Sequence, residues 1–279
     1  MPHQISYVDN SGAVLAHYKM LEVIKNFASA NGWDVLRYDD VSVNRELILK
    51  GYGLSGLDEI FVGFRTYHDI GADYYNLVAA GFTGYVAGNG FDTQPGVVLS
   101  GVPCHNSRVD YWLTCNAQRI ALAMKVGTPV YEHAYVGKFF PYARPSQYPY
   151  PVICGGMLTG ASATRFSEAT HSMPYKGNRA NFRMRFNDGT WRQPETHPWN
   201  SAVQTSTTFQ ERDTNGNYPL NPVTLSDANG IYGELDGICH ITGFNNSVEN
   251  TVVVDGKTWV IFQDVSRTGF ADYFAMRMD

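Results

Sequence analysis

Six residues in the first quarter of the chain, Gly51-Tyr52-Gly53-Leu54-Ser55-Gly56, match the G-x-G-x-x-G pattern of dinucleotide-binding loops. Such a loop binds a pyrophosphate when a strand enters it and a helix leaves it, because the helix N-terminus supplies the N–H groups. Residues 46–49 (ELIL) have strand composition, but residues 57–64 (LDEIFVGF) also have strand composition and place two carboxylates where phosphate charge would sit. We therefore expect these glycines to form a tight turn between two antiparallel strands.

Three groups carry residue types found in metal sites: Cys104-His105 with Cys239-His240, Glu195 with His197, and Asp213 with Asn215 and Asn217. Neighbouring residues of a strand point to opposite faces, so a Cys-His pair rarely gives both ligands to one ion. The second group lacks the helical spacing of H-E-x-x-H, and the third lacks the later Gly and Glu of a calcium loop. We expect turns and core histidines here, and no metal or cofactor.

Catalytic patterns are weak. The sequence has no G-x-S-x-G nucleophile elbow, and neither Cys-His pair has an evident orienting residue. Four carboxylates, Asp58, Glu59, Asp69 and Asp73, are candidates for a glycosidase pair, but the ~5–9 Å separation that such a pair needs is a property of the fold. We predict that the protein is not an enzyme.

One helix is expected near the N-terminus, over about residues 13–31. Apolar residues recur there at helical spacing, at positions 14, 18, 21, 24, 27 and 28, and Asn31-Gly32 supplies a left-handed C-cap. Most of the remaining sequence has the composition of strands joined by short, glycine-rich links. The prediction is a β-rich α+β fold, mainly antiparallel and sandwich-like, with this single helix.

Strands are expected at residues 34–38, 46–49, 59–64, 111–115, 119–126 and 131–136. Two hairpins are indicated as well. Asp255-Gly256 separates two runs of β-formers, and residues 182–186 alternate apolar and basic before the turn at Asn187-Asp188-Gly189. The proline-rich stretch 139–152 cannot be a central strand, so it is a rigid crossover or a domain junction. We place a boundary near residue 155, giving regions 1–155 and 156–279; a single domain is the alternative.

Composition narrows the class of partner. The 279 residues carry a net charge of −5 with no basic block, so nucleic acid is a poor partner. No apolar run approaches the ~20 residues that span a bilayer, and the first residues (MPHQISYVDNSG) do not resemble a signal peptide. The four scattered cysteines indicate reduced, mostly buried thiols in a protein that folds in a cytoplasm.

Three stretches resemble, in the same order, a group of virion structural proteins of tailed bacteriophages: residues 46–86 (beginning ELILKGYGLSGL), 111–152 (YWLTCNAQRIAL) and 236–279 (DGICHITGFNNS). The resemblance implies a protein of the tail or baseplate region, made in the bacterial cytoplasm and located in the virion. It implies no catalytic residues, since the group has no defined catalytic motif. The partners it implies are other tail or baseplate proteins and copies of the chain itself.

Low charge (17%) and abundant tyrosine (18 residues) agree with extensive protein or carbohydrate contact, although we expect most of the aromatic side chains to fill the faces of β-sheets. The candidate interface residues are Tyr142, Arg144, Tyr148 and Tyr150, because Tyr and Arg are enriched in interfaces and a rigid Pro/Tyr segment loses little entropy on docking. The leading hypothesis is a non-enzymatic tail or baseplate building block. A receptor- or glycan-binding module at the tail tip is the second hypothesis, and an envelope-degrading hydrolase is the third.

Overall fold

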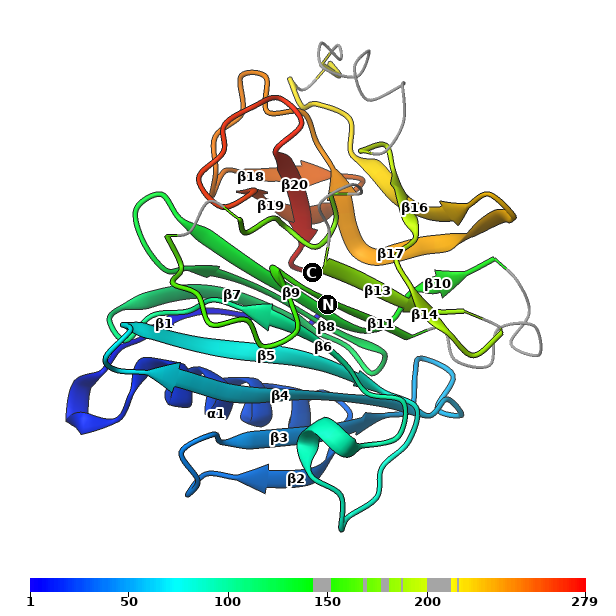
Figure 1. The fold of residues 1–279 in the computed structure, drawn as a ribbon. Helices are drawn as coiled ribbons and strands as arrows, with labels where there is room; N and C mark the ends of the chain where they lie inside the picture. The colour runs from blue at the N-terminus through cyan, green and yellow to red at the C-terminus, as the bar shows by residue number, and fades with distance from the viewer. Residues whose placement is uncertain (143–151, 168–169, 177–180, 187, 200–211, 215) are drawn as a thin grey trace.

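The computed structural model describes residues 1–142, 152–167, 170–176, 181–186, 188–199, 212–214 and 216–279 (Figure 1). These residues form one α-helix and three antiparallel sheets stacked as layers. The predicted β-rich α+β class is confirmed. We call the layers the helix-side sheet, the central sheet and the C-terminal sheet.

The helix, α1 (Ala16–Ser29), lies within the predicted range, and a 3-10 turn at Ser11–Ala13 precedes it. Its first free N–H group, that of Ala16, donates to the Asn106 side chain 90 residues away (3.2 Å). Its end is closed by a hydrogen bond from the Asn31 N–H to the Ala28 carbonyl, followed by Gly32 at a φ of +92°. The predicted left-handed position at the helix end is therefore correct, because glycine accepts this φ without steric cost.

The helix-side sheet has the strand order β12-β6-β5-β4-β3-β2. Its strands are β2 (Trp33–Asp39), β3 (Glu46–Gly51), β4 (Ile60–Asp69), β5 (Tyr74–Phe82), β6 (Val98–Val102) and β12 (Leu158–Thr159). Short turns join its four longest strands as an antiparallel meander. A 3-10 turn, Phe91–Thr93, lies in the long connection between β5 and β6.

The central sheet has the order β1-β7-β8-β9-β11-β13-β14. Its strands are β1 (His3–Val8), β7 (Val109–Cys115), β8 (Arg119–Lys125), β9 (Tyr131–Lys138), β11 (Val152–Gly156), β13 (Asn181–Arg185) and β14 (Trp191–Arg192). The boundary predicted near residue 155 falls inside β11, which pairs with β9 on one side and β13 on the other. The division into two regions stays a prediction.

The C-terminal sheet has the order β15-β16-β17-β20-β19-β18, and β10 (Phe140–Pro141) pairs with β17 beside this path. Its strands are β15 (Glu195–His197), β16 (Asn221–Asp227), β17 (Gly230–His240), β18 (Thr251–Val254), β19 (Lys257–Gln263) and β20 (Tyr273–Arg277). In Figure 1 this sheet lies above the central sheet, and the helix-side sheet with α1 lies below it.

The middle strands of the central sheet, β7, β8 and β9, are buried on both faces. One face packs with the helix-side sheet and α1 around residues such as Phe64, Leu113 and Leu122. The other face packs with the C-terminal sheet around residues such as Tyr135 and Phe262. This explains why β7, β8 and β9 show almost no alternation of apolar and polar residues, since neither face meets water.

Both predicted hairpins are present. β18 and β19 pair in register around Asp255 and Gly256, whose φ values of +51° and +71° define the tight turn that the D-G pair predicts. β13 pairs with β14, and Phe182 and Met184 are buried on the face that the alternation indicates. Strand β1 was not expected. Its residues Gln4-Ile5-Ser6-Tyr7 alternate polar and apolar side chains, but this pattern is only four residues long and most of the strand is exposed.

Candidate interaction surface

The glycine-rich stretch is a turn, as the sequence predicts. It leaves β3 and enters β4, which are paired antiparallel, and no helix follows it. Gly53 and Gly56 have φ values of +68° and +73°, and a side chain at Gly53 would clash with the Asp58 carboxylate. The backbone conformation of the turn, rather than pyrophosphate binding, therefore explains the glycines. The turn leaves Leu54 and Leu57 exposed, and Leu57 is 88% exposed.

The metal candidates have other partners. Cys104 lies in the core between the helix-side and central sheets, whereas His240 packs its ring against Trp199 (5.1 Å between centroids). His197 Nε2 lies 2.8 Å from Ser226 Oγ, and Asp213 Oδ1 accepts from the Asn217 N–H at 2.8 Å. Asn215 lies outside the described residues. Within the described part of the chain, no three His, Cys, Asp or Glu residues are arranged to hold a metal ion.

All four cysteines are free thiols, three of them buried and Cys239 half-buried. Burial raises the pKa of each thiol to about 12. The thiolate is the nucleophilic form, so these side chains pack as small hydrophobic residues. The prediction of reduced, mostly buried thiols agrees with this structure.

The four candidate carboxylates each have a structural partner. Asp58 accepts from Lys138 Nζ and Glu59 from Lys50 Nζ, both at 2.9 Å. Asp73 pairs with Arg165 (2.6 Å). Asp69 accepts from the N–H groups of the two turn residues at positions 71 and 72. These contacts hold turns together and account for all four side chains.

A strongly perturbed acid and base lie next to each other in the interior. Glu132 of β9 and His171 are both fully buried, with 2.7 Å between Glu132 Oε1 and His171 Nδ1. Burial, with a contribution from the Asp264 charge, raises the pKa of Glu132 well above its usual range. Burial, aided by the charge of Arg267, lowers the pKa of His171 to about 4. Perturbed groups of this kind occur at active sites and also in structural networks.

Contacts around this pair indicate the structural role. Arg267 donates to the His171 carbonyl (2.8 Å) and pairs with Asp264 (3.0 Å). Asp264 in turn accepts from the Met173 N–H (2.6 Å). The network thus joins the segment around His171 to β9 and to the turn after β19. Both members of the pair have no exposed surface, so a substrate cannot reach them in this conformation.

The predicted interface residue Tyr142 lies at the end of β10 and is exposed. Its N–H donates to the Tyr232 carbonyl (2.9 Å), and its hydroxyl donates to the Glu234 carboxylate of β17. The hydrogen bond to Glu234 raises the pKa of Tyr142. Phe140 of β10 is exposed next to it. Arg144, Tyr148 and Tyr150 lie outside the described residues, so of the four candidates the structure places Tyr142 alone.

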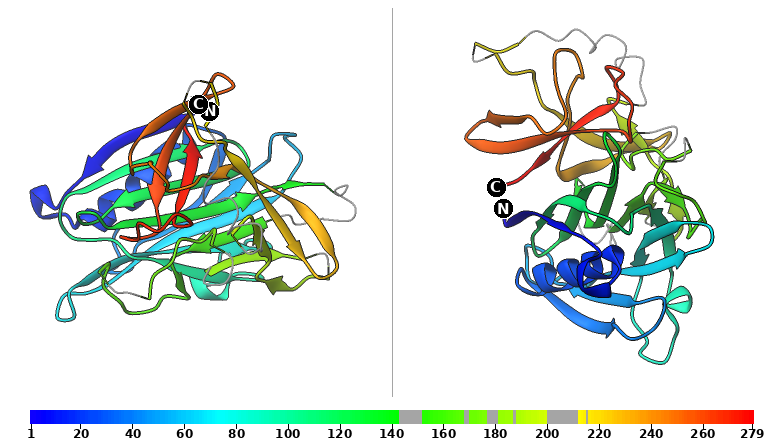
Figure 2. Two further views of the ribbon diagram at one scale, coloured as in Figure 1. Left: turned by 90° about the horizontal axis from the view of Figure 1, so that it is seen from above. Right: turned by 90° about the vertical axis from the view of Figure 1, so that its left-hand side faces the viewer.

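Three turns with exposed apolar residues lie at one end of the molecule (right in Figure 1). They are the β3–β4 turn with Leu54 and Leu57, the end of β10 with Tyr142, and the β16–β17 turn with Ile231. The view from above in Figure 2 places the same three segments at one end. The ion pair between Asp58 and Lys138 joins the first of these turns to the strand that leads into β10.

Two further apolar turns lie at the opposite end (left in Figure 1). The β2–β3 turn carries Val41 and Val43, and the β4–β5 turn carries Ile70; all three side chains are exposed, Val41 by 91%. We use the name turn tips for these two turns and for the three turns described in the preceding paragraph. These turn tips were not predicted from the sequence, although a leucine or valine among Gly, Ser and Asp residues is the available signal, since such a residue has no strand to bury it.

Neither the protein-family models nor the curated protein sequences contain a match to this chain. Among the described residues, no helix is long and apolar enough to span a membrane.

Proposed function

We propose that this chain is a non-enzymatic building block of a bacteriophage particle, located in the tail or baseplate region. It assembles through protein–protein contacts with other tail or baseplate proteins and with copies of itself. The observation that carries the proposal is the gathering of exposed apolar side chains on turn tips at two opposite ends of the molecule. The part of the proposal that concerns the phage particle depends on the resemblance of three long stretches of sequence to virion structural proteins.

Contacts at two different ends suit a subunit in a larger assembly. An interface that joins unlike surfaces of neighbouring subunits generates a ring or a filament. Single exposed apolar residues are ordinary, but several on adjacent turns form a surface that gains free energy when a partner covers it. Leu54 and Leu57 have little intramolecular reason to be apolar, because both are exposed.

The remaining chemistry also favours a building block over an enzyme. The buried Glu132–His171 pair has no exposed surface, and the surface carboxylates Asp58, Glu59 and Asp73 are each held by a lysine or an arginine. The free thiols are held in their protonated form by burial. These polar groups have partners inside the fold. The exposed leucines and valines of the turn tips are not needed for folding and are available for contact with another protein.

The test is incorporation into particles. A phage that lacks its own copy of this gene is grown with the wild-type protein, Leu54→Ser/Leu57→Ser, or Val253→Ser supplied in the host. Val253 is an exposed valine of β18 and serves as the matched control. Complete burial of one leucine contributes about 1.5–3 kcal/mol. Leu54 and Leu57 are 60% and 88% exposed, so losing both from an interface weakens it by about 40-fold or more, and we expect much less of the double variant in purified particles.

Thermal unfolding separates assembly from folding. Both variants change exposed side chains, so we expect them to unfold within a few degrees of the wild-type protein. Incorporation of the double variant at the wild-type amount would exclude this turn as a contact. Equal loss of the Val253→Ser protein would show that the effect is not specific to the turn tips.

A further inference from the structure

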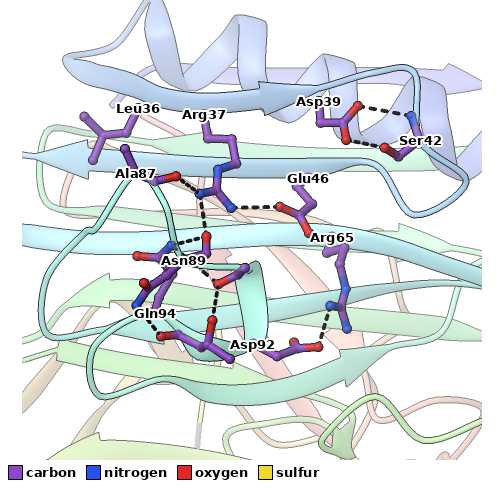
Figure 3. A network of polar contacts seen from close by, with 12 residues as sticks. Leu36, Arg37, Asp39, Ser42, Glu46, Arg65, Ala87, Asn89, Asp92 and Gln94 are labelled. Carbon is purple, nitrogen blue, oxygen red and sulfur yellow. Dashed lines mark hydrogen bonds and ion pairs between the residues drawn. The ribbon is translucent and has the colours of Figure 1, made fainter.

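Among the described residues, the three sheet paths end in six edge strands, the two-residue β10 lies as a further edge beside β17, and most of these edges are protected. Figure 3 shows how the edge at β2 is covered: Arg37 Nη2 donates to the Ala87 and Asn89 carbonyls of the β5–β6 connection (2.9 and 2.7 Å). The Tyr85 hydroxyl also donates to the Leu36 carbonyl of β2 (3.2 Å). The pairing of β2 with β3 is irregular between Val35 and Arg37. A covered and irregular edge does not accept another strand.

The other edges differ in length. β12 and β14 have two residues each, β15 has three and β18 has four. β1 has six residues in unbroken register with β7, and it contains neither proline nor lysine. Ile5 and Tyr7 are 54% and 50% exposed. The left view of Figure 2 shows this dark-blue strand at the outer border of the molecule. β1 therefore lacks the devices that block edge pairing.

The register shows which backbone groups of β1 face outward. The Cys115 N–H donates to the Pro2 carbonyl (3.2 Å), so Pro2 and Cys115 form a hydrogen-bonded pair. Hydrogen-bonded and non-hydrogen-bonded pairs alternate along an antiparallel ladder. The next hydrogen-bonded positions are Gln4, Ser6 and Val8, which direct their N–H and C=O groups to β7. The backbone groups of the alternate residues 3, 5 and 7 consequently point away from the sheet.

We propose that β1 pairs with β1 of a second copy of this chain, antiparallel about a two-fold axis at Ile5. This register places Ile5 opposite Ile5 and His3 opposite Tyr7 of the second copy, and all of these residues have outward backbone groups. Three pairs that exchange two hydrogen bonds each give about six hydrogen bonds. The two central sheets then form one continuous sheet across the dimer.

The side chains fit this register. Ile5 packs against Ile5, and His3 lies beside the Tyr7 ring, where cross-strand apolar and aromatic pairs stabilise a sheet. On the other face Gln4 lies opposite Ser6. The pairing brings no two like charges opposite each other. It also sets His3, the ionisable residue of β1, diagonally from Asp9 of the second copy, an anion held near Lys19 in each copy (3.2 Å).

Hollows that can take side chains of a strand added at the edge lie on both faces of β1. A hollow of about 390 Å³ adjoins Ile5 and Tyr7 together with Trp112 of β7. A second hollow of about 360 Å³ adjoins Ser6 and Val8 on the face of α1. The Arg108 guanidinium lies over the Tyr7 ring at 4.0 Å and holds that ring at the rim of the larger hollow. Side chains of an added strand can therefore enter without displacing the core.

The test is the oligomeric state of the purified full chain, measured by sedimentation velocity over its soluble concentration range. We expect a monomer–dimer equilibrium for the wild-type protein. Ile5→Lys sets two ammonium groups opposite each other on the axis, and we expect it to raise the dimer dissociation constant by at least about tenfold. Gln4→Lys adds the same charge opposite a serine, and it is the matched control that retains the dimer.

A backbone variant tests the hydrogen bonds themselves. Ile5→Pro removes an N–H that points outward, so it spares the pairing with β7 and weakens the dimer. Thermal unfolding verifies that each variant is folded, as the exposure of Ile5 leads us to expect. A wild-type protein that is monomeric at every concentration overturns the proposal, as does a dimer that persists in folded Ile5→Lys and Ile5→Pro. The turn tips take no part in this pairing, so the outcome is independent of particle incorporation.

Discussion

Replacing Asp236 tests whether a buried charge pair holds the central and C-terminal sheets together. Asp236 belongs to β17, and its Oδ2 lies 3.7 Å from Arg119 Nε of β8, with both side chains almost wholly buried. The same oxygen accepts from Asn116 Nδ2 and Gln118 Nε2, each at 2.8 Å. The turn between β7 and β8 is thereby fixed to the C-terminal sheet through one carboxylate.

The magnitude follows from what Asp236→Ala leaves behind. The Arg119 guanidinium remains buried without a counter-charge, and the amides of Asn116 and Gln118 lose their acceptor. Breaking a buried ion pair by removing one partner costs about 3–5 kcal/mol. That loss is a large fraction of the roughly 5–15 kcal/mol by which a folded domain is stable. Replacing both charged partners with apolar residues, as in Arg119→Met/Asp236→Leu, is expected to recover the part of the loss that is due to the unpaired guanidinium.

The assay is equilibrium unfolding in urea, with the free energy of unfolding compared between variants. Glu59→Ala is the control, because its ion pair with Lys50 (2.9 Å) is at the surface and the Glu59 side chain is 64% exposed. Exposed pairs contribute about 0–1 kcal/mol. An Asp236→Ala protein within about 1 kcal/mol of the wild type would refute the reasoning.

Three further predictions follow from the backbone, the histidines and the thiols. Gly256→Ala and Gly237→Ala impose the same left-handed strain of about 1–2 kcal/mol, since the φ values of the two glycines are +71° and +73°. Only Gly237→Ala also clashes with the Arg119 guanidinium, so urea unfolding should show it to be the less stable variant. Equal losses of stability in the two variants would contradict the clash. Burial lowers the pKa of His133 to about 4, below the usual 6.5, so the unfolded chain takes up a proton that folded His133 does not. The free energy of unfolding should therefore fall as the pH drops from 6.5 toward 4, by up to about 1.4 kcal/mol per pH unit from this residue. His133→Gln should make the free energy of unfolding depend less steeply on pH. An unchanged pH dependence in this variant would exclude His133 as the cause. The three buried cysteines should not react with a thiol reagent until the protein is unfolded, and their rapid modification in the native state would contradict the burial.

Local patterns in the sequence predicted the helix and many of the strands, including the buried strands β7, β8 and β9. The helix near residues 13–31 and the Asp255-Gly256 hairpin are correct because apolar period and turn chemistry act over a few residues. The glycine turn at residues 51–56 was also interpreted correctly from the strand that follows it. The stacking of three sheets was beyond this reasoning, because it depends on which sheet covers each face of the central one.

The interaction surface was harder to predict for a related reason. Tyr142 is exposed as predicted. The apolar turn tips were missed, because an exposed leucine in a turn has no periodic signal and is recognised only when the fold shows that nothing covers it. Strand β1 was missed although Gln4-Ile5-Ser6-Tyr7 alternate, because four alternating residues are a weak signal and the strand buries little of its surface. The Glu132–His171 pair joins residues 39 positions apart through tertiary packing alone.

The central claim, that this chain is a building block of a phage particle, is tested most directly by quantitative mass spectrometry of gradient-purified particles from the source system. The copy number is measured against that of the major tail protein. We expect the protein in intact particles at a whole multiple of the rotational symmetry of the tail. Its absence from intact, infectious particles would contradict the claim.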